Sequence, residues 1–251
     1  MQGAGMIADM HCHLDLYPDY LAVAEESAAR GVWVLAVTTT PTAWKGTRDR
    51  LRAFPNISVA IGLHPELAHL RQQELRLMER QIPGVTFIGE IGLDGSTHLR
   101  AYATLQQSIF KRILRSCELA GGRILSIHSR RASAVTLECL EQYPGCGVPI
   151  LHWFNGSKRD FAQANRMDCW FSVGPPMLST PVGIERVLAV PRNRLLLETD
   201  GPFAKIDDMS LKPVAVFAAT EMLAKVWQAP LAEVQRQLEE NQRTILRLAG
   251  I

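Results

Sequence analysis

The chain carries two histidines two positions apart, directly after a short apolar run. His11 and His13 follow Met6-Ile7-Ala8. In a β-strand, residues i and i+2 point to the same face, so both imidazoles can be directed at one point. This is the arrangement that a divalent metal ion needs. Taken alone, the pair is explained equally well by two solvated histidines near the N-terminus.

Four further strand-like runs end in residue types that bind metal ions. Each run is apolar, ends in His, Glu or Asp and then meets a turn; the ligand-type residues are Glu90, His128, His152 and Asp200. A single residue of this kind often only caps the next helix or bonds to the backbone. Five such strand ends in one chain indicate instead a site at the carboxyl ends of parallel strands.

Eight strand-like runs alternate with helical patterns. The runs are 7–11, 32–38, 57–64, 85–92, 123–128, 149–154, 169–174 and 195–200. Helical patterns cover 20–30 and 99–120, and two more in 211–248 are separated near Pro230. This alternation predicts βαβ units of the α/β class, and eight repeats predict closure into a (β/α)₈ or TIM barrel. A doubly wound open sheet is the competing architecture, but its ligands would gather at one switch point.

Length and composition agree with one enzyme domain. The chain has 251 residues, and a TIM barrel needs about 250, so we expect a single domain over 1–251. The net charge of +2 gives no sign of a general nucleic-acid coat. The five cysteines lack a CxxC spacing and are predicted to be buried thiols in a reducing compartment. No apolar run approaches about 18 residues, so we expect a cytoplasmic protein without membrane association.

Six motifs resemble, in order, the successive signatures of the TatD-type metal-dependent hydrolases. They are DMHCHLD, IGLHP, GEIGLD, IHSR, HWFNGS and LLETDGPF, and they run from residue 9 to residue 203. The resemblance implies a TIM barrel with one or two divalent metal ions (Zn, Mg or Mn). It also implies hydrolysis of phosphodiester bonds, as a deoxyribonuclease or 3′-exonuclease, with DNA or an oligonucleotide as substrate.

The opening segment DMHCHLDLYPDY is similar, more narrowly, to QatD, the TatD-type subunit of bacterial Qat anti-phage defence systems. That likeness implies a role in defence beside other Qat proteins, an ATPase and a deazaguanine-synthase-like protein. One segment departs from the family pattern. Members carry an Arg-x-Asn-Glu-Pro-like segment after strand 8, whereas residues 207–213 read Asp-Asp-Met-Ser-Leu-Lys-Pro and keep only the proline. We therefore expect the loop that closes over the site, and with it substrate choice, to differ.

The family resemblance also implies a role for each ligand-type residue. Six are implied as metal ligands: His11, His13, Glu90, His128, His152 and Asp200. Glu90 has two carboxylate oxygens and would bridge two ions, one held with His11, His13 and Asp200 and the other with His128 and His152. Two ions about 3.5–4 Å apart can clamp the attacking and leaving oxygens of a phosphoryl displacement. Asp200 and Glu90 are thus the implied catalytic residues, and Asp200 would accept the proton of the attacking water.

Two residues near these ligands are predicted to bind substrate. Arg130 lies two positions after His128, and its guanidinium can make two bonds to a phosphate. An ion pair with a carboxylate at the barrel rim explains Arg130 equally well. His64, in the IGLHP motif, is predicted to contact phosphate or assist the leaving group. The alternative for His64 is a hydrogen-bonded structural histidine.

Other residues around the ligands have supporting roles. Asp9, Asp94 and Glu198 are predicted to orient the ligand histidines or their loops. Three aromatic residues flank the ligands and can stack on bases or pack in the core: Trp153, Phe154 and Phe203.

Two other functions stay open at this point, because one barrel fold supports many chemistries. The same metal centre can hydrolyse an amide, a lactone or an ester. Alternatively, the protein is a subunit of a defence complex whose binding surface matters more than its metal site.

Overall fold

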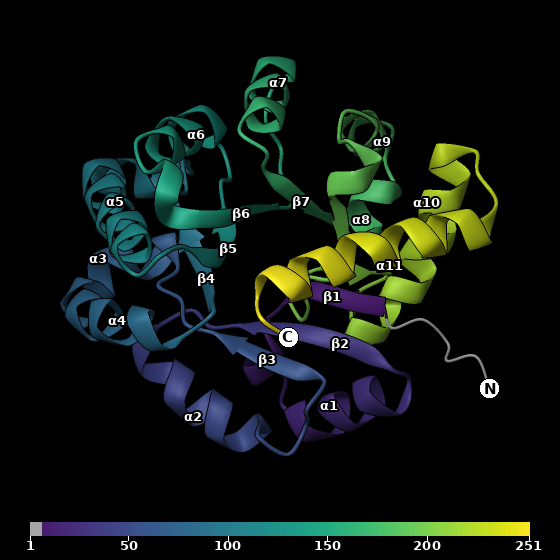
Figure 1. The fold of residues 1–251 in the computed structure, drawn as a ribbon, viewed down its shortest axis with the longest axis horizontal. Helices are drawn as coiled ribbons and strands as arrows, with labels where there is room; N and C mark the ends of the chain where they lie inside the picture. The colour runs from purple at the N-terminus through teal and green to yellow at the C-terminus, as the bar shows by residue number, and fades with distance from the viewer. Residues whose placement is uncertain (1–6) are drawn as a thin grey trace. The chain divides into compact units, whose positions relative to one another are not determined.

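The computed structural model describes residues 7–251, so residues 1–6 of the predicted domain lie outside the described residues. The chain runs in Figure 1 from purple at β1 to yellow at α11. The strands are β1 (Ile7–Cys12), β2 (Val32–Val37), β3 (Ile57–Ala60), β4 (Phe87–Gly92), β5 (Arg123–His128), β6 (Gly147–His152), β7 (Trp170–Val173), β8 (Leu195–Leu197), β9 (Lys205–Ile206) and β10 (Met209–Ser210).

Helices follow the strands along the chain, which is the element order of a (β/α)₈ barrel (Figure 1). They are α1 (Tyr20–Ala29), α2 (Pro41–Leu51), α3 (Ala68–Arg71), α4 (Leu75–Gln81), α5 (Ala103–Leu119), α6 (Ser133–Glu141), α7 (Lys158–Arg166), α8 (Pro175–Leu178), α9 (Pro181–Leu188), α10 (Val216–Trp227) and α11 (Leu231–Leu248). Within residues 7–251, no helix is long and apolar enough to cross a membrane.

Each of the eight predicted strands is present, but five end earlier than predicted, and two of these by three residues or more. The run 195–200 is a strand only to Leu197, because Asp200 has a φ of +52°, which lies outside the extended region. The run 57–64 is a strand only to Ala60. There the Gly62 amide donates to the Thr38 hydroxyl at 3.1 Å instead of continuing a ladder.

The two-stranded β9–β10 hairpin was absent from the sequence prediction. Its turn residues Asp207 and Asp208 both have positive φ, +49° and +63°. Aspartate tolerates this conformation better than most side chains, and two successive positive φ values are typical of a two-residue hairpin turn. The Asp207-Asp208 pair was therefore the sequence feature that could have predicted this hairpin turn.

The chain divides into two compact units, and each is described by itself. Unit 1 contains the chain up to Ala36, Arg50–Ser58 and Phe171–Ile251; unit 2 contains Val37–Asp49 and Val59–Trp170. The expectation of a single domain over 1–251 stays a prediction.

In unit 1, β1 and β8 belong to different sheets of parallel strands but are in contact with each other. β1 pairs with β2 in the register Ile7↔Val32, and β7 pairs with β8 in the register Phe171↔Leu195. Helix α11 lies against both β1 and β8. The Asn241 amide of α11 is buried and donates to the carbonyl oxygens of Arg192 and Leu195, at 2.7 Å each, which fixes the helix to the start of β8.

In unit 2, β4, β5 and β6 are successive parallel neighbours, with registers Phe87↔Ile124 and Ile124↔Val148. Helix α5 is amphipathic. Its buried residues recur every three or four positions and include Phe110, Ile113, Leu114 and Cys117. Across both units, the five cysteines are buried free thiols, as predicted.

Candidate metal centre

In unit 1, three predicted ligands form what we call the unit 1 cluster: His11, His13 and Asp200. The Nε2 atoms of both histidines lie 3.7 Å from Oδ1 of Asp200. Both histidines are buried, whereas the Asp200 side chain is 16% exposed. One ligand atom from each residue lies within 4.8 Å of the others, so a single ion can contact all three.

Backbone hydrogen bonds place Asp200 beside the two histidines. The Asp200 amide donates to the His11 carbonyl at 2.9 Å, and the His13 amide donates to the Gly201 carbonyl at 2.8 Å. Position 201 has no room for a side chain, because a Cβ there would lie 1.9 Å from the Tyr17 hydroxyl. That hydroxyl donates to the Leu211 carbonyl. The segment after β8 is thus fixed against the end of β1.

Asp9 ties the same two strand ends through its buried carboxylate. It accepts from the amides of His11 at 3.2 Å and Thr199 at 2.9 Å, and from the Thr199 hydroxyl. Burial raises the pKa of Asp9 to about 8, although these hydrogen bonds act to lower it. Asp9 therefore acts as an orienting group for the backbone that carries the ligands. Thr199, its partner, was missed by the sequence prediction.

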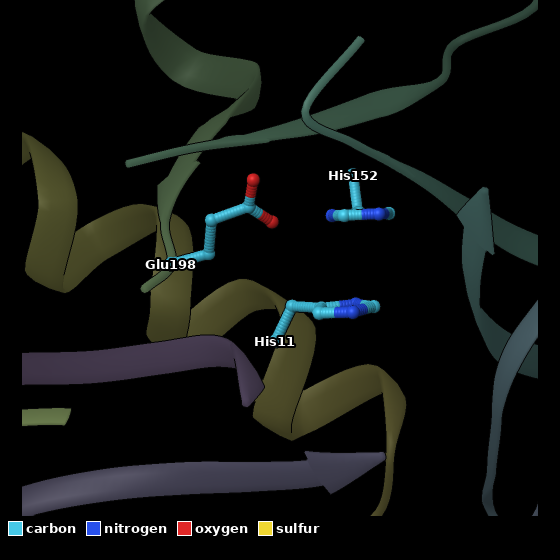
Figure 2. Close-up of side chains that lie close together, drawn as sticks. All are labelled: His11, His152 and Glu198. Atoms are coloured by element: carbon cyan, nitrogen blue, oxygen red, sulfur yellow. The ribbon is translucent and has the colours of Figure 1, made fainter. Parts of the chain in front are cut away.

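Glu198 lies next to this network and is also buried. Its carboxylate accepts a hydrogen bond from the Ser172 hydroxyl at 2.5 Å. Figure 2 shows the side chains of His11 and Glu198, both from unit 1, and also labels His152 of unit 2.

In unit 2, imidazoles surround one carboxylate, and we call Glu90 with His64, His128 and His152 the unit 2 cluster. Oε1 of Glu90 lies 2.7 Å from His128 Nδ1, 3.2 Å from His64 Nε2 and 3.3 Å from His152 Nε2. Glu90 is buried in the carboxyl-terminal half of β4, two residues before its end, and His128 and His152 end β5 and β6. The parallel neighbours β4, β5 and β6 therefore deliver their three predicted ligands to one point.

His128 is held between two carboxylates. Its Nδ1 faces Glu90, and its Nε2 lies 2.9 Å from Oδ2 of Asp94. Burial would lower the pKa of His128, but the hydrogen bonds to Asp94 and Glu90 outweigh it and raise that pKa. For Asp94, burial opposes ionisation, yet hydrogen bonds from His128 and Ser96 hold its pKa below the usual range. Asp94 thus fixes the orientation of the His128 ring.

His64 was predicted as a substrate contact outside the ligand set, but the structure places it on Glu90. Its Nδ1 accepts a hydrogen bond from the Glu66 amide at 3.1 Å, which leaves Nε2 directed at the carboxylate. The chain approaches Glu90 closely here, since a Cβ on Gly62 would lie 2.4 Å from the Glu90 amide nitrogen. The geometry therefore adds His64 to the candidate ligands; its predicted contact with substrate stays a prediction.

Arg130 is exposed on the loop after β5, and its carbonyl accepts a hydrogen bond from Gly95 at 2.8 Å. Among the residues that the structure describes, its guanidinium makes no hydrogen bond or ion pair. Among the described residues of unit 2, no carboxylate pairs with Arg130, and its predicted contact with phosphate stays a prediction.

The aromatic residues beside the candidate ligands differ in burial. Phe154 is 1% exposed and packs edge-on against Phe161, with ring centroids 4.9 Å apart, so it belongs to the core. Phe203 is 60% exposed, and its ring lies edge-on to His13 at a centroid distance of 4.9 Å.

Both clusters fit divalent metal ions by the chemistry of their donors. Imidazole nitrogens combined with carboxylate oxygens suit Zn, Mn, Fe or Co, and carboxylates also suit Mg. His64, Glu90 and His128 form a second group whose ligand atoms lie within 4.8 Å of one another. The prediction that all six implied ligands meet in one pocket stays a prediction.

Comparisons with known proteins agree on one family. The model of the TatD related DNase family matches residues 8–247. The uncharacterized metal-dependent hydrolase YcfH of Escherichia coli K12 is 31% identical over 216 residues, which cover 78% of each chain. The 3′-5′ ssDNA/RNA exonuclease TatD of Pantoea vagans is 27% identical over 202 residues, 75% of this chain and 77% of the relative.

The solved structure of YjjV, a TatD homologue from Escherichia coli K12, superimposes with a TM-score of 0.85 at 21% identity, over 95% of this chain and 97% of the other. This likeness confirms the predicted α/β (β/α)₈ barrel. The family match likewise confirms the predicted enzyme class, a metal-dependent hydrolase acting on phosphodiester bonds. The chain belongs to the family of TatD-related DNases.

Proposed function

We propose that this protein is a divalent-metal-dependent deoxyribonuclease that removes nucleotides from a 3′ end. The observation that carries the proposal is the unit 2 cluster, in which one oxygen of a buried carboxylate lies within 3.3 Å of three imidazole nitrogens. Such convergence of buried ionisable groups has no simple structural explanation and is typical of a metal site. The ligands that we propose are His11, His13, Glu90, His128, His152 and Asp200.

Each residue of the site has a separate role in the proposed reaction. When bound, divalent ions supply charge stabilisation to the phosphoryl group and acidify the attacking water. Asp200 accepts the proton of that water, and its partly exposed carboxylate is accessible for this step. Asp94 keeps the His128 ring in place, and the Glu66 amide does the same for His64. The unpaired guanidinium of Arg130 binds a phosphate of the substrate.

The relatives and the charge of the chain support a single-stranded substrate. The Pantoea vagans relative bears the name of an exonuclease of single-stranded DNA and RNA, which supports a single-stranded end as substrate. A net charge of only +2 argues against extensive tracking of a duplex backbone. The activity assay compares Zn, Mg and Mn as the activating metal.

We also propose that the enzyme works in the cytoplasm in bacterial anti-phage defence, beside other Qat proteins. The support is the likeness of residues 9–20 to QatD. Phage challenge of cells that carry the complete operon, with and without Asp200→Asn, tests this role. Equal protection by both versions would reject a catalytic contribution to defence, and co-purification of the neighbouring gene products would then assess the binding role.

The activity is tested on oligonucleotides labelled at the 3′ or the 5′ end, single- and double-stranded, with Mg²⁺, Mn²⁺ or Zn²⁺ added to metal-free protein. We expect stepwise shortening from the 3′ end of single strands and loss of activity with EDTA. A parallel panel of amides, esters and lactones tests the other hydrolase chemistry. Turnover of a neutral ester or lactone without turnover of any oligonucleotide would overturn the nuclease proposal.

A further inference from the structure

We propose that Phe203 is a stacking subsite for an unpaired nucleobase of the substrate. This inference rests on the proposed function and extends it, because it names the part of the oligonucleotide that the protein recognises. Phe203 lies three residues after Asp200, and its ring is in edge-on contact with His13 at 4.9 Å. An aromatic surface is therefore in direct contact with a candidate metal ligand.

The ring of Phe203 is exposed to solvent. A phenylalanine side chain is usually buried, yet Phe203 is 60% exposed. Ile206 and Met209 follow at 38% and 72% exposure, and they are cross-strand partners in the β9–β10 hairpin. The segment after the catalytic aspartate thus presents apolar side chains to solvent.

The ring of Phe203 is also held in place. The Ala204 amide donates to the Asp200 carbonyl at 3.0 Å, and the Leu211 amide donates to the Ala204 carbonyl at 2.9 Å. The neighbouring Gly201 carbonyl accepts from the His13 amide. Hydrogen bonds fix the backbone on both sides of Phe203. Binding of a base therefore costs little conformational entropy of this segment, which favours affinity.

The position of the ring indicates what would occupy the subsite. A phosphodiester that reaches His13 and Asp200 carries a base one sugar away, and every base offers a π-face to an aromatic ring. Exposed charged residues, Lys205, Asp207 and Asp208, interrupt the apolar surface of the hairpin. This pattern suits one planar ring better than the extended apolar face of a protein partner. Bases in a duplex are already stacked, so the subsite selects single strands.

Equilibrium binding tests the subsite directly. Anisotropy of a fluorescent single-stranded oligonucleotide is measured in EDTA, so that hydrolysis does not interfere. The substrates are an intact strand and strands with an abasic nucleotide at each of the last three 3′ positions. We expect Phe203→Ala to weaken binding of the intact strand by about 5- to 150-fold, the range of one base–aromatic stack.

An abasic nucleotide at the stacking position should weaken wild-type binding by a similar factor and leave Phe203→Ala unchanged. Phe203→Trp should retain wild-type affinity. The matched control is Leu188→Ala, which removes a 58% exposed apolar side chain of α9 in the same unit and should change nothing. Equal affinity of Phe203→Ala and wild type for the intact strand would overturn the proposal. An equal loss of wild-type affinity for all three abasic strands, relative to the intact strand, would also overturn it.

Kinetics separate this inference from the proposed function. With metal present, Phe203→Ala should raise KM for an oligonucleotide by the factor seen in binding. If wild type hydrolyses no phosphodiester, the proposed function fails, and the binding comparison still decides the stacking. If wild type degrades oligonucleotides and Phe203→Ala has an unchanged KM, the stacking fails and the function stands. Loss of self-association in Phe203→Ala with unchanged strand binding would assign the ring to contacts between copies and overturn the subsite.

Discussion

At the scale of single residues, neighbours decide the role of each ligand-type side chain. Asp200 and Asp94 are both aspartates near histidines, but their surroundings differ. Asp94 is buried and engaged by His128 and Ser96, so it is fixed as an orienting group. Asp200 is partly exposed and lies 3.7 Å from two imidazoles, so it can receive a proton from a substrate water.

The catalytic role of Asp200 is tested by Asp200→Asn. The amide keeps the shape of the side chain but cannot accept the proton as a carboxylate does, so turnover should fall by at least about 10²-fold. Circular dichroism should show an unchanged fold, and metal content by mass spectrometry separates proton transfer from metal loss. Near-wild-type turnover at saturating metal would reject the role.

Arg130 tests the substrate class. Arg130→Ala should reduce kcat/KM for a phosphodiester far more than for a neutral ester, because two charge-assisted bonds to phosphate are lost, about 1.5–3 kcal/mol or more. The matched control is Arg166→Ala, which removes an exposed arginine at the end of α7 in the same unit. Equal losses on both substrates would make Arg130 a structural residue and weaken the nuclease proposal.

At the scale of elements, strand ends carry the candidate ligands, and hydrogen bonds hold those ends in place. The strands β4, β5 and β6 are parallel neighbours, so their last residues meet at one edge. The ligand segment after β8 is irregular, and it is held by backbone bonds to His11 and His13 instead of by a ladder. Helix α11 supports the start of β8 through Asn241.

Replacing that support should destabilise the protein without touching the ligands. Asn241→Leu leaves the carbonyl groups of Arg192 and of the buried Leu195 without this donor and should cost about 1–3 kcal/mol of unfolding free energy. Urea denaturation measures the loss. The control is Gln235→Leu, an exposed position on the same helix, which should stay within about 0.5 kcal/mol of wild type. Equal stability of both variants would contradict the role of Asn241.

At the scale of the whole molecule, metal binding and folding are linked. If an ion binds at the proposed ligands, it would stabilise the negative charge of the buried Glu90 carboxylate in the folded protein. Any ligand that binds only the folded state raises its stability, by about 2.7 kcal/mol at a free concentration of 100 Kd. The metal that fits the site should therefore stabilise the protein most.

Thermal unfolding with each metal should reveal this preference. At 100 Kd, Tm should rise by about 5–10 °C, given about 2–4 °C per kcal/mol for a chain of this size. Glu90→Gln should lose most of the shift, because the three imidazoles lose their shared carboxylate. Arg166→Ala should respond as wild type does. A shift in Glu90→Gln as large as in wild type would exclude Glu90 as a ligand.

The sequence by itself determined the fold class and the order of the elements, and it named most of the candidate ligands. Short apolar runs ending in His, Glu or Asp are local patterns, and alternation of strands with helices limits the topology to few choices. The confirmed barrel and the grouping of Glu90, His128 and His152 follow from that logic. The resemblance of the motifs supplied the family, which the family match confirmed.

Tertiary structure alone decided what depends on distant neighbours. His64 joined the candidate ligands because the close approach at Gly62 brings the turn after β3 to Glu90. Thr199 became a partner of Asp9, although 190 positions separate them. Burial assigned Phe154 to the core and left Phe203 exposed, a distinction that two phenylalanines near ligand motifs cannot show in a sequence. The physical reason is that side-chain contacts and exposure are set by packing between segments remote in the chain, whereas a sequence pattern reports only local backbone preference.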